Sequence, residues 1–435
     1  MADPGRVAVA AALAVLALTG AFGAVATTTG PTAERPAEPP ATTPASGSPS
    51  GFAALHASGV TGANVSVGVV DVTGFETDAP VLDDRVRAAR AFGTGSVSAP
   101  PSGHGTAVAT VVARTAPDAT LSLARVDGPD SYRRAVRWLR EAGVDVVVAP
   151  VSFYGQPGDG SGEAARAAAR ASDDGVVFVA PAGNLAEGHW RGRYDGDSAA
   201  DGALAFADGE TRTAIRGGTE VTVWLSWPRD SADEDYTAEL YWTNGTATRL
   251  VARSQPYTAD ETPNERIVAE VSPGRYFLRV RGPAEPTGTR VRLVSPTHEF
   301  EHARGRGSIV APATASGVVT VGAYDTRVDR VEPFSSRGPT ADGRVGVDVV
   351  APDRRFAGLT ERGFVGSSAA TPYVGGLAAL LLSADGSLSP ATVELLLEVT
   401  ARDVGPRGVD YASGHGLVQP GPAVAAATNN TTAAG

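Results

Sequence analysis

The feature that most constrains the fold is a repeated alternation of short apolar runs with segments of helical periodicity. Apolar strands that alternate with helices are typical of a parallel sheet whose two faces are both covered. The runs that predict strands are residues 64–70, 121–126, 144–151, 176–180, 318–323 and 347–350. The intervening helical segments are residues 107–113, 132–142 and 163–172. We therefore predict an α/β fold with a doubly wound, mainly parallel sheet.

The pattern changes between residues 189 and 306, where apolar and polar side chains alternate with period two. Val221, Val223 and Leu225 alternate with polar neighbours, and a Pro273-Gly274 turn precedes a second alternating run. Period two is typical of half-buried antiparallel strands. We predict a small antiparallel β-sandwich inserted into the α/β domain. Its acidic loop at residues 230–235 is expected to be a solvated loop rather than a cation site.

The ends of the chain differ from this core. Residues 1–26 contain an apolar run that predicts either a signal peptide or an uncleaved N-terminal anchor, and residues 27–50 form a Thr/Pro-rich linker. The rest is predicted to be exported, extracellular or at the cell surface. We expect the main domain at residues 51–188 and 307–423, the inserted sandwich at residues 189–306 and a flexible tail at residues 424–435.

Composition excludes some classes of function. The chain has 48 acidic residues against 37 basic ones, a net charge of −11, and all of the basic residues are Arg. This balance argues against nucleic acid or an anionic membrane as the main partner. The absence of Cys excludes disulfides, a thiol nucleophile and a cysteine metal site.

Chemistry is predicted at the start of one apolar helix. Gly366-Ser367-Ser368 opens a run of small residues that becomes strongly apolar, and Pro372 is tolerated only in a first helical turn. Ser368 is thus placed at a helix N-terminus, where backbone N–H groups favour a developing negative charge. A helix-capping serine would have the same local pattern.

Three further polar residues follow predicted strands or begin helices. Asp71 ends the first strand, His104 lies between two glycines before a helix, and Asn184 follows a later strand. In open α/β sheets the ligand site lies beyond the carboxyl ends of the strands, so Asp71 and Asn184 are expected to converge there. Aspartate, histidine and serine are the groups that nucleophilic acyl transfer needs, and an Asn amide can bind the oxyanion.

The motifs around these residues resemble those of the subtilisin-like serine proteases, the subtilases. The motifs that carry the resemblance are Gly103-His104-Gly105-Thr106, Ala182-Gly183-Asn184, Gly366-Ser367-Ser368-Ala369-Ala370-Thr371-Pro372, Phe334-Ser335-Ser336-Arg337-Gly338-Pro339 and Asp348-Val349-Val350-Ala351-Pro352. The resemblance covers the chain from Gly51 to Gly188 and from Gly307 to Ala423. It implies that Ser368 is the nucleophile, His104 the general base and acid, Asp71 its orienting partner, and Asn184 an oxyanion donor.

The resemblance also implies a wall of residues that bind substrate. The chain departs from the family at two positions. The residues expected to bind substrate are Ser152, Phe153, Tyr154, Gly155, Ala182 and Gly183. Tyr154 stands where the family carries Gly, which is expected to narrow the pocket and restrict specificity. Val72 follows the aspartate where the family usually has Ser or Thr, so either the aspartate loses a supporting hydrogen bond or Thr73 supplies it. The expected reaction is hydrolysis of polypeptide substrates by a monomer without cofactor or metal.

Three other interpretations fit parts of the sequence. A nucleophile elbow at Ser368 with Asp403 or Asp410 and His415 follows the α/β-hydrolase order, but it needs further strands after the serine. The His298-to-His302 spacing matches a zinc protease only if a helix carries both side chains. We expect a loop or short helix there. A weakly active subtilase fold that serves as a surface adhesion module is the third interpretation.

Overall fold

The computed structural model describes residues 51–98, 103–195, 202–259, 262–354 and 364–433. The predicted signal or anchor and the linker lie outside these residues. A central sheet runs in the order β17-β16-β5-β4-β1-β3-β2, with β18 beside β16, and every pairing is parallel except β16 with β17. Its strands are β1 (Ser66–Asp71), β2 (Val86–Ala91), β3 (Thr120–Arg125), β4 (Val146–Val148), β5 (Val177–Pro181), β16 (Val318–Asp325), β17 (Arg330–Val331) and β18 (Val349–Pro352). The mainly parallel sheet predicted from the apolar runs is confirmed.

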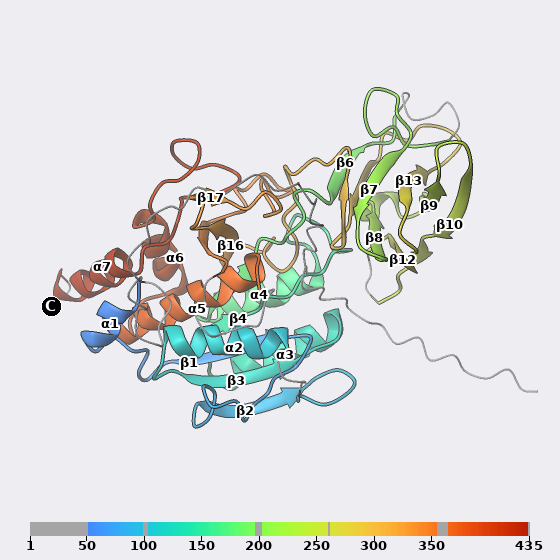
Figure 1. Cartoon of the computed structure of the whole chain (residues 1–435). Coiled ribbons are helices and arrows are strands. Elements are labelled where there is room, and N and C mark those ends of the chain that lie inside the picture. The colour runs from blue at the N-terminus through green and yellow to red at the C-terminus, as the bar shows by residue number, and fades with distance from the viewer. Residues whose placement is uncertain (1–50, 99–102, 196–201, 260–261, 355–363, 434–435) are drawn as a thin grey trace, which may run out of the picture.

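Helices cover both faces of this sheet (Figure 1). The helices α2 (His104–Thr115) and α5 (Ser367–Ala384) pack together on one face, and α3 (Pro129–Glu141) and α4 (Glu163–Asp173) pack on the other. The short α1 (Ala53–Ala57), α6 (Pro390–Val399) and α7 (Pro420–Ala433) complete the domain. Buried residues of β1 alternate between the two faces, because Val67 and Val69 belong to one core and Val70 to the other.

Two glycines allow the central helix α5 to lie close to its neighbours. A Cβ on Gly375 would lie 2.2 Å from Val148 Cγ2 of β4, and one on Gly376 would lie 2.4 Å from Thr115 of α2. Both separations are far below van der Waals contact, so a larger residue would push α5 away. Within the described residues, α5 is the one helix long and apolar enough to cross a membrane, but it is mostly buried inside the protein. It is therefore a core helix.

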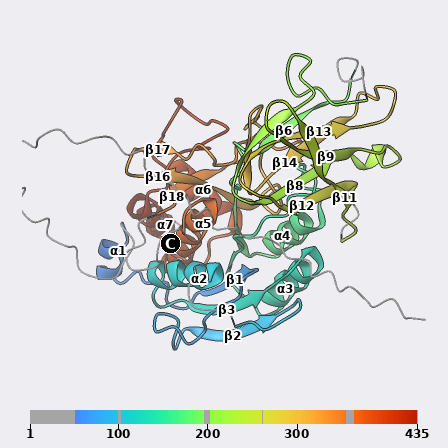
Figure 2. The same cartoon turned by 45° about the vertical axis from the view of Figure 1, so that its right-hand side comes forward.

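The segment after β5 forms two five-stranded antiparallel sheets, which confirms the inserted sandwich (Figure 2). The sheets run in the orders β10-β9-β13-β7-β15 and β11-β12-β8-β14-β6. Their strands are β6 (His189–Arg193), β7 (Thr213–Gly217), β8 (Glu220–Ser226), β9 (Thr237–Thr243), β10 (Thr248–Arg253), β11 (Gln255–Pro256), β12 (Asn264–Glu270), β13 (Arg275–Arg281), β14 (Arg290–Val294) and β15 (His298–Phe300). Trp190, Tyr236 and Leu278 are among the residues of its own hydrophobic core.

Two expectations were wrong, and one strand was missed. The tail is not flexible from residue 424, because α7 extends to Ala433 and buries Val424 and Ala427 against the main core. Residues 298–300 form the strand β15 rather than a loop or short helix, because they pair with β7. The edge strand β2 was not expected, since most of its residues are exposed or half-buried and carry no apolar run.

Candidate active site

The first element of the site is an aspartate–histidine pair at the carboxyl end of β1. Asp71 is fully buried at the last position of β1, and His104 is the first residue of α2. The Nδ1 atom of His104 lies 2.6 Å from Asp71 Oδ2. A carboxylate can only accept, so Nδ1 carries the proton and Nε2 is left as the basic nitrogen.

Thr73 supports this aspartate. Its backbone N–H and its hydroxyl each donate to Asp71 Oδ1 at 2.8 Å, and the hydroxyl accepts from the backbone N–H of Gly105 at 2.9 Å. Thr73 therefore takes the place that the sequence left open when Val72 replaced the expected Ser or Thr. The Gly105 position cannot hold a larger residue, because an added Cβ would lie 2.3 Å from the carbonyl oxygen of Gly74.

The second element is the N-terminus of α5. Ser368 is the second residue of this helix and is half-buried. Gly366 precedes the helix with φ +115°, and an added Cβ there would lie 2.6 Å from Asn184 Nδ2. The ring of Phe364 contacts the His104 ring edge-on with centroids 5.4 Å apart, which brings the start of α5 beside His104. In the described part of the chain no hydrogen bond joins Ser368 to His104. Catalytic hydrogen bonds are often long in the absence of substrate and shorten when it binds.

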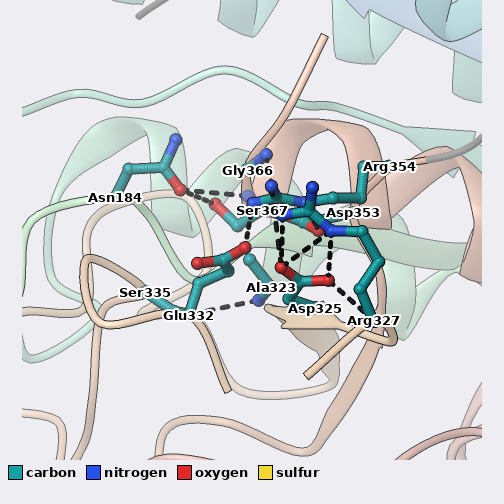
Figure 3. Close-up of polar contacts among 10 residues, drawn as sticks. All are labelled: Asn184, Ala323, Asp325, Arg327, Glu332, Ser335, Asp353, Arg354, Gly366 and Ser367. Carbon is teal, nitrogen blue, oxygen red and sulfur yellow. Dashed lines mark hydrogen bonds and ion pairs between the residues drawn. The ribbon is translucent and has the colours of Figure 1, made fainter. Parts of the chain in front are cut away.

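Ser367 holds Asn184 in one orientation (Figure 3). Asn184 Oδ1 accepts from both the backbone N–H and the hydroxyl of Ser367, at 3.0 Å each. With its oxygen engaged, the amide nitrogen of Asn184 points away from Ser367 (Figure 3). The Ser367 hydroxyl also accepts from the N–H of Gly183 at 3.2 Å. The amide nitrogen has no hydrogen-bond partner in the described chain and is therefore available as a donor.

The backbone N–H groups at the start of α5 differ in whether they have a hydrogen-bond partner. The N–H groups of Ala369 and Ala370 donate to the carbonyl of Gly366, and the N–H of Ser367 donates to Asn184. Ser368 is left as the first-turn residue whose N–H has no partner in the described chain. An unpaired N–H at a helix N-terminus favours negative charge.

A charged network beneath Gly366 was not expected from the sequence (Figure 3). The buried Asp353 accepts from the Gly366 N–H at 3.2 Å and from Arg354 Nε at 3.0 Å. Arg354 also pairs with Glu332, while Arg327 pairs with Asp325 at 2.6 Å and lowers the pKa of that carboxyl to about 2. The signal in the sequence was a carboxylate at the end of each of two buried strands: Asp325 is the last residue of β16, and Asp353 directly follows β18.

The predicted substrate wall lies partly in the interior. Phe153 and Ala182 are buried, and the Phe153 ring packs edge-on against Tyr132, so only their backbones can face a substrate. Tyr154 packs against a small apolar cluster that joins the α/β domain to the sandwich, and burial raises the pKa of its hydroxyl to about 12. The cluster consists of Leu185, Trp224, Val294 and Val310. Gly155 lies directly under the sandwich, since an added Cβ would lie 3.0 Å from Trp224.

The residues of the two rival interpretations do not assemble into their sites. His298 bonds to Thr297 and to the Gly218 carbonyl, whereas His302 lies 3.1 Å from Glu210. Among the residues described after Ser367 the regular elements are helices, not the strands that a nucleophile elbow needs. His415 lies 3.3 Å from Glu398, away from the predicted elbow serine.

One group of carboxylates has the spacing of a cation site. The carboxylate oxygens of Asp348, Glu394 and Glu398 all lie within 4.8 Å of one another. Burial and the neighbouring Glu394 raise the pKa of Asp348 to about 8. Protonation of Asp348 at neutral pH therefore already relieves the repulsion among these groups.

Known proteins resemble this chain in sequence and in fold. The sequence model of the subtilase family matches residues 62–212 and 301–416. Tripeptidyl-peptidase 2 of Caenorhabditis elegans is 31% identical over 129 residues, which are 24% of this chain and 9% of that protein. Serine protease AprX of Bacillus subtilis is 32% identical over 115 residues, 21% of this chain and 26% of that protein. The matched segments thus span only a small part of these relatives.

A solved structure has the same fold over most of the chain. The Clostridium perfringens CspB protease superposes with a TM-score of 0.62 at 18% identity, covering 85% of this chain and 94% of that one.

Proposed function

Because the chain belongs to the subtilase family, we propose that it is a serine endopeptidase that hydrolyses peptide bonds through an acyl-enzyme intermediate. The single observation that carries this proposal is the buried Asp71–His104 pair at the carboxyl end of β1, beside the N-terminus of the helix that carries Ser368. A buried aspartate that fixes a histidine tautomer is the arrangement that prepares a general base.

Each residue has one role in the proposed reaction. His104 Nε2 removes the proton of the Ser368 hydroxyl as that oxygen attacks the substrate carbonyl, and it later gives the proton to the leaving amine. Asp71 stabilises the imidazolium that forms. A water then attacks the acyl-enzyme with His104 again as base, and the free acid leaves.

The negative charge of the tetrahedral intermediate falls on the former carbonyl oxygen. The Asn184 amide nitrogen and the Ser368 backbone N–H are the donors that would bind it, because both lie at the start of α5 without another partner in the described chain. Removing one such donor typically lowers turnover by about 10²–10³. Ser367 is a positioning residue, because it acts by holding the Asn184 amide.

Replacing Ser368 by Ala tests the proposal. We expect kcat to fall by a factor of about 10⁴–10⁶, a magnitude taken from the measured loss in subtilisin, with the thermal unfolding temperature unchanged. A serine-directed phosphonate should add its mass to the unmodified protein and not to the variant. Undiminished peptide hydrolysis by the alanine variant would refute the assignment and leave a binding module as the better interpretation.

We further propose that cleavage is restricted. The packing of Tyr154 against the sandwich cluster, which fixes its side chain, supports this proposal. Peptide-library profiling should reveal a preference for particular residues on the acyl side, while rapid general degradation of unfolded casein would contradict it.

Export to the extracellular space or cell surface is also proposed, from the apolar segment at residues 7–26. Fractionation of cells that express the full chain tests it.

A further inference from the structure

Four arginines form an array on one sheet of the sandwich. Arg191 and Arg193 alternate along the edge strand β6, and Arg290 and Arg292 alternate along its neighbour β14. The strands pair so that Arg292 lies opposite Arg191 and Arg290 opposite Arg193. Like charges directly opposite each other destabilise a sheet. The alternating residues Trp190 and Leu293 are buried in the sandwich core, which places the arginines on the outer face.

This face borders a cleft of about 1390 Å³ between the sandwich and the α/β domain. The opposite wall includes residues 155–159 and the start of α4, with residues 339–341 beside them. Arg292 Nη1 donates to the carbonyl of Gln156 at 3.1 Å, and an added Cβ on Gly307 would lie 2.6 Å from Arg191 Cζ. The guanidinium groups of Arg191 and Arg292 therefore lie between the two domains.

Three of the four arginines form no ion pair within the described chain. Arg191, Arg290 and Arg292 have no carboxylate within ion-pair distance in the described residues. The carboxylates that also line the cleft are those of Asp130, Asp159, Glu163, Asp195 and Asp230, against seven lining arginines: Arg166, Arg191, Arg193, Arg229, Arg290, Arg292 and Arg304. The Nε and Nη2 atoms of Arg292 are buried and lack any hydrogen-bond partner in that part of the chain. Burial and the nearby Arg191 lower the pKa of Arg292 to about 10, so the group stays charged at neutral pH. Unpaired buried donors are costly unless a ligand satisfies them.

We propose that this cleft binds the carboxylate groups of an acidic segment of the polypeptide substrate. The inference rests on the proposed peptidase function. A substrate is the favoured source of the anion because the cleft begins at Gly155 and Gln156, directly after Tyr154 of the predicted substrate wall. An extension of a substrate bound at that wall is therefore the proposed occupant. Guanidinium groups form paired hydrogen bonds with carboxylates, so the array selects Asp- or Glu-containing segments.

The test separates binding from cleavage by using the full chain with Ser368→Ala. Two fluorescent peptides are compared by anisotropy, identical except that one carries four Glu and the other four Gln in the same extension. We expect the Glu peptide to bind at least about tenfold more tightly, the factor that one charged hydrogen bond contributes. Adding Arg290→Gln and Arg292→Gln should abolish this preference. Arg249→Gln, an exposed arginine on β10 of the other sheet, is the matched control and should leave it intact.

A structural role for the arginines predicts different results. Arg292→Gln removes a buried charge but also the hydrogen bond to the Gln156 carbonyl, so the two roles are separated by binding: loss of a purely structural arginine would weaken the Glu and Gln peptides equally. Equal binding of the two peptides overturns the proposal. So does a preference that survives in the double arginine variant, or millimolar sulfate that occupies the cleft without affecting peptide binding. If the Glu peptide binds as expected but the unmodified protein cleaves neither peptide, the peptidase assignment fails while the acidic-segment site stands.

Discussion

Replacing Thr73 by Val tests how Asp71, the proposed catalytic aspartate, is supported. The hydroxyl of Thr73 donates to Asp71 Oδ1 at 2.8 Å and accepts from Gly105 N–H at 2.9 Å. Val keeps the shape and the backbone N–H bond to Asp71 but removes both hydroxyl contacts. A hydrogen bond to a charged group contributes about 1.5–3 kcal/mol, and an unsatisfied buried donor costs about 1–3 kcal/mol.

These energies set the expected size of the effect. If the lost bond to Asp71 is felt fully in the transition state, kcat/KM falls about 10- to 100-fold, since 1.4 kcal/mol corresponds to a factor of ten. The backbone bond of Thr73 remains, so the lower part of that range is expected. The unpaired Gly105 N–H should also lower the free energy of unfolding by about 1–3 kcal/mol.

The assay is kcat/KM on a fluorogenic peptide, measured well below the unfolding temperature of each variant. Thr73→Ser keeps the hydroxyl and should retain activity within about threefold by the same reasoning. A Thr73→Val enzyme that is fully folded and within twofold of the unmodified kcat/KM would refute the view that the hydroxyl supports the aspartate.

Three other changes test separate parts of the structure. Asn184→Ala should lower kcat by about 10²–10³ with little change in KM, because the oxyanion forms only along the reaction. A rise in KM as large as the fall in kcat would contradict this. Gly375→Ala should destabilise the protein by about 1–3 kcal/mol in chemical denaturation, because the added Cβ overlaps Val148 under the helix that carries the nucleophile. The third change concerns Asp348, whose folded pKa of about 8 exceeds the unfolded value near 3.9. The folded state therefore holds a proton on Asp348 that the unfolded state releases. The contribution of Asp348 to the free energy of unfolding is fully present below about pH 4 and is lost as the pH rises towards 8. Asp348→Asn should flatten the fall in unfolding free energy between pH 5 and 8, and an unchanged slope would show that another group titrates.

The sequence by itself determined the elements that depend on local pattern. Buried parallel strands are mostly apolar, so β1, β3 and β5 were found from their apolar runs, whereas β2 is an exposed edge strand and was missed. The sandwich was recognisable because period-two alternation differs from the continuous runs around it. The tail was misjudged because its small residues carry a weak apolar signal, and only packing against the main core makes α7 stable.

Candidate site residues were predictable where the chain itself marks them, by a strand end or by glycines around a helix start. Asp71, His104, Asn184 and Ser368 are in this class. Their partners were not, because a hydrogen-bond partner is decided by which distant segments meet. The network under Gly366 joins β16, β18 and the start of α5. The hydrophobic periodicity of each segment by itself does not predict these contacts.

The arginine array illustrates the same limit. Each strand by itself reads as an ordinary half-exposed strand with charged residues on its outer face. Only the register of β6 with β14 places Arg191 against Arg292, and only the contact between sandwich and α/β domain turns that face into a cleft. Local pattern determines secondary structure because side-chain direction repeats along the backbone, while electrostatic environment is a long-range sum that exists only once the chain has folded.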